Sequence, residues 1–412
     1  MIAASFRPAR FVSAMCAIAG LVAIGALASC APPEGPKPPP PPVVETKPAV
    51  PATHPLTGEE PGFLRLPNMP EGRTPIRVGV LLPFSNGQAA TRALAKAMMN
   101  AAQLALFDAH NPDMLLMTAD EGSTPTEAAT GAHQLVDQGA EVIIGPVFAA
   151  SVSAVAPIAR DRGIPLIAFS TDRTVAGDGV YLLSYQPGNE VRRIVSYAAS
   201  HGHMNFAALI PRTAYGDRVE EALKAEADAE KLHVTTIQRF NTGVSDFTPE
   251  VKAVADSGAD AVLVAQGGTA MSIIAGAFNN STAHPQLLGT GLWADRGMDR
   301  AAITGGWFAA PSPEADAAFD SKYKAVYAAD PPPLAPLAYD AVSLIAAMSS
   351  GPPYHRFTQA ALTDPNGFFG VSGIFRFDAD GSADRGLAVL QVNGDDARVI
   401  DPAPRTFQVP HA

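Results

Sequence analysis

Polar side chains stand directly after several short apolar segments of this 412-residue sequence. Ser85 follows IRVGVLLPF, Tyr215 follows FAALIP, and Gln266 and Thr269 follow DAVLVA. IPLIAF is followed by Ser170, Thr171 and Asp172. Ligands of open α/β sheets bind at the carboxyl ends of the strands, so these side chains are candidates for a small-molecule site. Hydroxyl, phenol and amide groups without a paired base are suited to hydrogen bonding rather than to nucleophilic attack.

Patterns for catalysis or metal binding are not found in the sequence. It contains neither G-x-S-x-G nor H-E-x-x-H. Asp378, Asp380 and Asp384 could suggest calcium, but the glycine of this segment, Gly381, stands in the wrong place for an EF-hand loop, and a β-turn is expected. Residues 289–294 fit a relaxed dinucleotide pattern without opening a long helix. We expect no catalytic residue, no metal and no cofactor.

The elements that must position the polar residues follow a regular alternation. Strand-like apolar runs, such as 76–84 and 114–120, precede segments whose apolar residues recur at helical spacing, such as 89–108. Short apolar strands separated by helices predict parallel sheets that are covered by helices on both faces.

This alternation extends to about Gly291, which is too many units for one modest open sheet, and Pro187-Gly188 interrupts it near the middle. Two more helices and a hairpin around residues 378–381 are expected after it. We predict an α/β fold of two Rossmann-like lobes with a ligand cleft between them. The expected boundaries are 76–187 plus about 312–384 for lobe 1, and 188–311 plus about 385–405 for lobe 2.

The first 30 residues have the layout of an export signal that ends in a cysteine. Arg7 and Arg10 supply positive charge, residues 11–27 are almost entirely apolar, and small residues precede Cys30. The tetrapeptide Leu27-Ala28-Ser29-Cys30 resembles a bacterial lipobox, whose cysteine is acylated and becomes the first mature residue. We expect a signal peptide over 1–29 and lipid on Cys30 that binds a membrane. The alternative is a plain transmembrane anchor, because the run approaches the ~20 residues needed to span.

A proline-rich linker is predicted over residues 30–75. About a third of residues 31–75 are proline, including an unbroken run from Pro38 to Pro42. Such a chain is expected to be a disordered but semi-rigid tether, with a maximal reach of roughly 140 Å. In lipoproteins with this motif, an aspartate after the cysteine retains the protein in the inner membrane. Ala31 therefore favours the outer membrane of a Gram-negative cell.

Charge and cysteine content narrow the function classes. The formal net charge is −11 and no Lys/Arg cluster occurs, which argues against nucleic acid as a partner. Of the two cysteines, Cys16 lies within the predicted signal peptide, so no disulfide is expected in the mature chain. Stability is then expected to come from ordinary hydrophobic cores.

Four segments, in order and at the right spacing, resemble the type I periplasmic binding proteins of the Leu/Ile/Val-binding class. They are IRVGVLLPFSN, GAEVIIGPVFAASVSAVAPIARDRGIPLIAFST, TAYGDRVEEAL and GIFRFDADGSADRGLAVLQV, and the pattern covers nearly all of 76–399. Within this class, the lipoprotein start together with GPVFAASVSAV, PLIAFS and YLLSYQPGNEVRRI looks most similar to the penicillin-binding protein activators. Those are outer-membrane lipoproteins that stimulate peptidoglycan synthases.

The resemblance also implies how an amino acid would be held. Binders of this class use a hydroxyl and backbone amides for the ligand carboxylate, and the hydroxyl position falls at Ala149, with Ser151 nearby. Tyr215 matches a tyrosine of the family. The acid for the ligand ammonium falls near Gly291, and no carboxylate follows until Asp295. A buried ammonium without a carboxylate would be strongly unfavourable.

Asp172 adds a second obstacle to a free amino acid. Its charge would repel a ligand carboxylate unless a cation such as Arg173 countered it. A standard α-amino acid is therefore an unfavourable ligand, and Ser170, Thr171, Tyr215 and Gln266 would suit a neutral or larger molecule better. The alternative is that these residues only cap helices and close the cleft.

Two functions of different classes follow. The first is a non-enzymatic, lipid-anchored periplasmic regulator that contacts a peptidoglycan synthase (a penicillin-binding protein), with the tether giving it reach. The second is the solute-binding subunit of an ABC importer for branched-chain or other amino acids, amides or short peptides, with a permease as its partner. A sensory module that reports a ligand to a membrane receptor is a third possibility.

Overall fold

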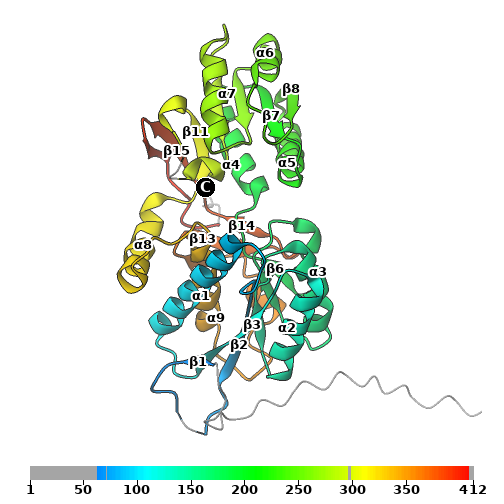
Figure 1. The fold of residues 1–412 in the computed structure, drawn as a ribbon, viewed down its shortest axis with the longest axis vertical. Coiled ribbons are helices and arrows are strands. Elements are labelled where there is room, and N and C mark those ends of the chain that lie inside the picture. Colours follow the sequence, from blue (N-terminus) through cyan, green and yellow to red (C-terminus); the bar gives the residue numbers. More distant parts are fainter. Residues whose placement is uncertain (1–62, 71, 296–297, 408–412) are drawn as a thin grey trace, which may run out of the picture. The chain divides into compact units, whose positions relative to one another are not determined.

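A computed structural model describes residues 63–70, 72–295 and 298–407. All of them lie in one compact unit, Pro48–Ala412. The predicted signal peptide, Cys30 and the linker up to Gly62 lie outside the described residues. Within the described residues the chain forms two α/β lobes, each built on its own sheet (Figure 1). The predicted fold class is therefore confirmed.

Lobe 1 is built on a sheet that has six strands within the described residues, in the order β1-β3-β2-β4-β5-β6. All neighbouring strands pair in parallel except β1, which pairs antiparallel with β3. The strands are β1 Leu64–Arg65, β2 Ile76–Leu82, β3 Met114–Asp120, β4 Val142–Ile144, β5 Leu166–Ala168 and β6 Val180–Leu182.

Helices cover both faces of this sheet. Along β2, Val78, Val80 and Leu82 point into one hydrophobic core, whereas Leu81 points into the other. The first core is closed by α1 Ala89–Ala109, α8 Pro313–Tyr327 and α9 Ala335–Ala347, and the second by α2 Pro125–Asp137 and α3 Ala149–Arg160. The short helices η1 Arg173–Val175 and α10 Gln359–Leu362 complete this part. All residues of β2 are buried, as expected for a parallel strand between two helical layers.

Lobe 2 follows the same plan on a sheet with seven strands in the described residues, in the order β16-β15-β11-β10-β9-β7-β8. The strands are β7 Asn205–Pro211, β8 His233–Phe240, β9 Ala261–Val264, β10 Gln286–Gly289, β11 Trp307–Ala310, β15 Ala388–Asn393 and β16 Asp396–Asp401. One face is covered by α4 Pro187–Ser200 and α5 Ala214–Glu230, the other by α6 Thr248–Asp256 and α7 Thr269–Asn279. Two short 3-10 helices, η2 Gly291–Ala294 and η3 Ala301–Ile303, follow β10.

A small antiparallel sheet of β12 Phe368–Gly370, β13 Gly373–Phe377 and β14 Ala383–Arg385 completes the described part. It packs on lobe 1, since Phe375, Phe377 and Ala383 belong to the first core. The chain passes between the lobes at residues 183–186, 311–312 and 386–387, which we call the three crossovers. The exact boundaries predicted for the lobes stay a prediction.

Two sequence-based expectations about these elements need correction. Folding does not begin at Ile76, because β1 pairs with β3 and Leu66 is buried against the body of lobe 1. The predicted C-terminal hairpin is confirmed for β13 and β14 around the turn at 378–381. However, the second strand of this hairpin, β14, ends at Arg385. The next strand, β15, pairs with β11 in the sheet of lobe 2.

Among residues 63–70, 72–295 and 298–407, no helix combines the length and the apolar character needed to cross a bilayer.

Candidate functional site

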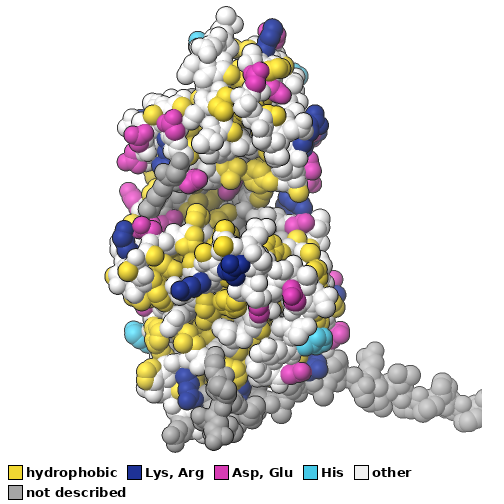
Figure 2. Space-filling model, in the orientation of Figure 1, with side chains coloured by type: hydrophobic (Ala, Val, Ile, Leu, Met, Phe, Trp, Pro, Cys, Tyr) yellow, Lys and Arg dark blue, Asp and Glu magenta, His cyan; other side chains and the backbone are white. Residues whose placement is uncertain are grey.

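The loops at the carboxyl ends of the strands in the two lobes face one another. Figure 2 shows the surface hollowed between the lobes, with hydrophobic side chains gathered around the hollow. An ion pair crosses from lobe 1 to lobe 2: Asp172, in the loop after β5, accepts a hydrogen bond of 2.5 Å from Nη2 of Arg218 on α5. The cleft expected from the sequence therefore has its predicted loops on both walls.

On the lobe 1 wall, the amides at the start of α3 already hold a carboxylate of the chain itself. Glu121, which is fully buried, accepts hydrogen bonds from the backbone N–H groups of Val147 (2.8 Å) and Phe148 (3.0 Å). Burial raises the pKa of Glu121, while these bonds and one from Ser151 oppose the rise. The buried Ser151 therefore serves Glu121. These donors are not free to bind a ligand carboxylate.

Two other predicted residues of this wall contribute differently. Ala149 is the first residue of α3 and is partly buried, without a polar side chain to offer. Ser85 is exposed, and its backbone N–H donates to Asp120 Oδ1 at 3.2 Å. Phe148, whose side chain is 42% exposed, is the large apolar group next to α3.

The loop after β5 is organised around its own polar groups. The Ser170 carbonyl accepts from Ser184 Oγ at 2.9 Å, and Ser170 Oγ accepts from the N–H of Asp172 at 3.1 Å. Thr171 is exposed. Burial alone would raise the pKa of Asp172. Hydrogen bonds from Thr174 and Arg218 outweigh this effect, so the pKa lies below its usual value. The cation that counters Asp172 is Arg218, whereas Arg173, which the sequence suggested for this role, pairs with Asp380.

On the lobe 2 wall, two predicted residues are joined through a third. The hydroxyl oxygens of Tyr215 and Thr290 lie 2.7 Å apart, and Thr290 immediately precedes Gly291. Desolvation by burial, and then the nearby Glu190, raise the pKa of Tyr215. Tyr215 and Thr290 therefore form one hydrogen-bonded cluster beside Gly291, just after the end of β10.

The remaining predicted residues of lobe 2 support the loops. The Gln266 carbonyl accepts from Trp293 Nε1 at 2.9 Å, which ties the loop after β9 to η2. Thr269 is exposed at the start of α7. A Cβ on Gly289 would lie 2.1 Å from the Trp293 ring, so the glycine in this dinucleotide-like pattern makes room for an indole.

The sequence missed an acidic group beside Gly291. Glu190 on α4 is 7% exposed, and its Oε2 accepts the Gly291 N–H at 3.0 Å. A Cβ on Gly291 would lie 2.5 Å from Glu190 Oε1, so glycine is needed there for the carboxyl group to fit. The expectation that no carboxylate lies near Gly291 was therefore wrong, since α4 supplies one. Burial raises the pKa of Glu190 to about 8.

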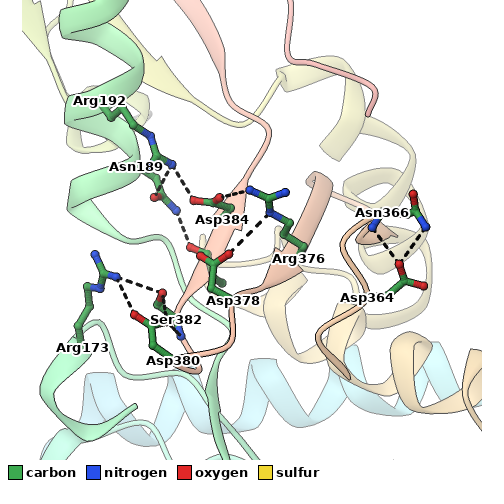
Figure 3. Close-up of polar contacts among 11 residues, drawn as sticks. Arg173, Asn189, Arg192, Asp364, Asn366, Arg376, Asp378, Asp380, Ser382 and Asp384 are labelled. Carbon is green, nitrogen blue, oxygen red and sulfur yellow. Dashed lines mark hydrogen bonds and ion pairs between the residues drawn. The ribbon is translucent and has the colours of Figure 1, made fainter. Parts of the chain in front are cut away.

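Hydrogen bonds and ion pairs join α4, which follows the first crossover, to β14, which precedes the third (Figure 3). Asn189 Nδ2 on α4 donates to the Ala383 carbonyl at 2.6 Å, and Arg192 pairs with Asp384 at 2.7 Å. Arg173 binds Asp380 and Ser382 at 3.2 and 3.1 Å. All three aspartates weighed as calcium ligands, Asp378, Asp380 and Asp384, thus pair with arginines. Within the described residues, no group of three or more possible metal ligands occurs.

A small recess lies beside these crossovers. It is lined by Tyr185, Gln186, Asn189, Glu190, Arg385 and Leu387. None of these six residues was predicted as a site residue. None of these residues belongs to a sequence motif that marks a binding site. Residues 185–190 and 385–387 come together only because the first and third crossovers run side by side. Only the positions of the crossovers, had they been known, could have pointed to these residues.

The fold and this cleft define a two-lobed ligand-binding protein. A family model described as periplasmic binding protein matches residues 75–397, and the chain belongs to this family. Membership implies a periplasmic location. A curated relative, the uncharacterized protein RP748 of Rickettsia prowazekii (strain Madrid E), is 22% identical over 149 residues, which are 36% of this chain. The aligned part covers 39% of that relative's length.

Solved structures share the fold. A Rhodospirillum rubrum protein, described as a branched-chain amino acid ABC transporter, matches with a TM-score of 0.72 at 20% identity, over 79% of this chain and 100% of that chain. A solute-binding protein of an ABC transporter from R. palustris, solved with benzoate, matches with a TM-score of 0.58 at 19% identity, over 81% of this chain and 97% of that chain.

Proposed function

We propose that the protein is a solute-binding protein that holds a small molecule between its two lobes and delivers it to an ABC permease. The observation that carries the proposal is the cluster of Glu190, Tyr215, Thr290 and Gly291 on the lobe 2 wall. Its buried carboxyl group forms no ion pair within the described residues and lies at the strand ends where α/β proteins bind ligands. The similar proteins described as ABC transporter components support the same class of function.

The walls of the cleft favour a ligand without a free carboxylate. Glu121 occupies the amides of Val147 and Phe148. Asp172 brings a negative charge to the neighbouring loop, although Arg218 pairs with it. Glu190 could accept an amine, so the ammonium of an amino acid is no longer an obstacle. Its carboxylate still is, because a buried anion needs compensating donors.

Calorimetry with the purified protein tests the proposal. We expect that free Leu, Ile and Val bind weakly or not at all, whereas a broad screen of small neutral solutes by thermal shift yields at least one ligand. A sub-micromolar dissociation constant for Leu, Ile or Val would contradict the ligand preference and leave the binding function standing. A complete lack of ligands in the screen would contradict the binding function itself.

A second candidate is a lipid-anchored envelope regulator that contacts a peptidoglycan synthase from the outer membrane. The observation that favours it is the sequence Leu27 to Cys30, followed by the proline-rich segment. Both readings predict acylation of Cys30. In cells fed a fatty-acid probe, we expect label on the natural protein and none on Cys30→Ala, which should be soluble in the periplasm or uncleaved in the inner membrane. Equal labelling of the two would rule out the anchor.

A further inference from the structure

The segment that follows β16, residues 402–407, leads from lobe 2 back to the small sheet on lobe 1. β16 belongs to the sheet of lobe 2, and Ala403 packs against a core of that lobe. Four residues later, the ring of Phe407 lies on the small sheet, with the guanidinium carbon of Arg376 on β13 4.7 Å from its centroid. We call residues 402–407 the strap. Within the described residues it is a fourth passage of the chain between the lobes.

The small sheet is shaped to hold the ring of Phe407. Gly367, just before β12, forms one side, since a Cβ there would lie 2.9 Å from two atoms of the ring. Arg376 forms another side, at a distance typical of a cation–π contact. By contrast, Phe369 on β12 is 84% exposed. The same sheet therefore accommodates one phenylalanine ring and leaves the other in solvent.

Arg193 on α4 holds the lobe 2 end of the strap. Its Nη2 donates to Asp401 Oδ2 at 2.7 Å and reaches the Pro402 carbonyl at 3.5 Å. Its Nε donates to the carbonyl of Leu387, in the third crossover, at 2.9 Å. One arginine thus joins the strap to the third crossover at this end.

Arg376 joins the same two segments at the lobe 1 end. Besides the contact with Phe407, its Nη2 donates to Asp384 Oδ2 at 2.9 Å, on the strand that leads into the third crossover (Figure 3). Between the two arginines the strap runs close to the crossover, because a Cβ on Gly386 would lie 3.1 Å from the Pro404 carbonyl. Two segments of opposite chain direction are therefore joined at both ends and in contact between them.

A short link with two anchored ends restricts how far the lobes can separate. Ala403 and Phe407 are four Cα–Cα steps of about 3.8 Å apart, so their Cα atoms cannot be separated by more than roughly 15 Å. Domains that close around ligands move by bending a few residues in their connecting segments. The three crossovers are covalent at both ends. The lobe 1 end of the strap differs, because it is held only by the non-covalent contacts of one ring.

We propose that the strap is a releasable link that limits the opening of the cleft, with Phe407 as the group that binds and releases. With the ring in place on Gly367 and Arg376, the lobes are held near the separation seen in this structure. With the ring released, they open wider. The inference rests on the proposed solute-binding function, since such a protein must open its cleft to take up and release a ligand.

Double electron–electron resonance on the whole purified protein, without added ligand, measures the distance between the lobes. Spin labels are attached to p-acetylphenylalanine in place of Ser153 on α3 and of Ala225 on α5, both exposed. Phe407→Ala should increase the fraction of wide inter-lobe distances about fivefold, as expected for the loss of a cation–π contact and of a partly buried ring. Phe407→Tyr keeps the aromatic face and should give the distances of the natural protein.

Phe369→Ala is the matched control, because it removes a phenylalanine ring from the same sheet at a position where the ring is in solvent. It should leave the distances unchanged. An unchanged distribution in Phe407→Ala would overturn the inference, as would an equal change in Phe369→Ala or in Phe407→Tyr. The measurement needs no ligand, so its outcome is separate from that of the ligand screen. Unchanged distances together with a ligand from the screen would reject the strap and leave the solute-binding function standing.

Discussion

Glu190 and Gly291 form a contact between residues 101 positions apart in the sequence. The resemblance placed an acidic position near Gly291, and the lack of a carboxylate before Asp295 suggested that the acid was missing. In the folded protein the glycine is what lets the carboxyl group of α4 reach the same place, since any side chain at 291 would collide with it. A sequence read position by position cannot find such an exchange, because it depends on the space between two elements.

The titration of Glu190 gives a test at this scale. Burial raises its pKa from 4.5 to about 8, so the folded protein holds the proton more tightly than the unfolded chain. The contribution of this group to stability is therefore full below about pH 4.5 and is lost as the pH rises to 8. Glu190→Gln cannot ionise. Relative to the natural protein, its free energy of unfolding should improve between pH 5 and pH 8, by on the order of 3 kcal/mol.

Denaturant unfolding of both proteins at pH 5, 6, 7 and 8 provides the measurement. Glu221→Gln, on the exposed side of α5, is the control and should follow the natural protein at every pH. A constant difference between Glu190→Gln and the natural protein would mean that Glu190 stays ionised in the fold.

At the scale of elements, the sequence pattern predicted what local residues decide. The strand at 114–120 has the bounds that were expected, because an apolar run of that length is typical of a buried strand in an α/β sheet. The helix after β7 begins at Ala214, since the Thr213 side chain accepts from the N–H of Gly216 and caps it. The alternation of apolar residues and the capping of helices depend on residues that are close in the sequence, so both can be predicted from it.

Elements that depend on distant partners were missed or misjudged. The two residues of β1 form a strand only because they pair with β3, and nothing in Leu64–Arg65 itself predicts it. Likewise, β14 and β15 read as one strand, yet Arg385 ends in the small sheet and Ala388 starts in lobe 2. This break is what brings Arg385 to the recess. The part of the candidate site formed at the crossovers was therefore beyond the reach of sequence analysis.

At the scale of the whole molecule, the two proposed functions require different things of the segment that precedes the described part. Asp172 and Arg218 link the two lobes across the cleft by an ion pair. In a solute-binding protein, residues 30–62 would keep the folded part near a permease in the same membrane. In a regulator, they would let it reach an enzyme in the opposite membrane. The length of this segment therefore separates the functions, whereas the cleft alone does not.

Deleting residues 36–61 tests this difference, and it leaves every described residue from Phe63 onward in place. The deletion would remove roughly 80 Å of maximal extended reach. A regulator of an enzyme in the opposite membrane should lose its effect, seen as greater sensitivity to cell-wall antibiotics. A solute-binding protein whose permease lies in its own membrane should keep its uptake of labelled solutes, because anchoring already keeps its effective concentration high. We expect the second result. Increased antibiotic sensitivity with unchanged uptake would instead favour the regulator.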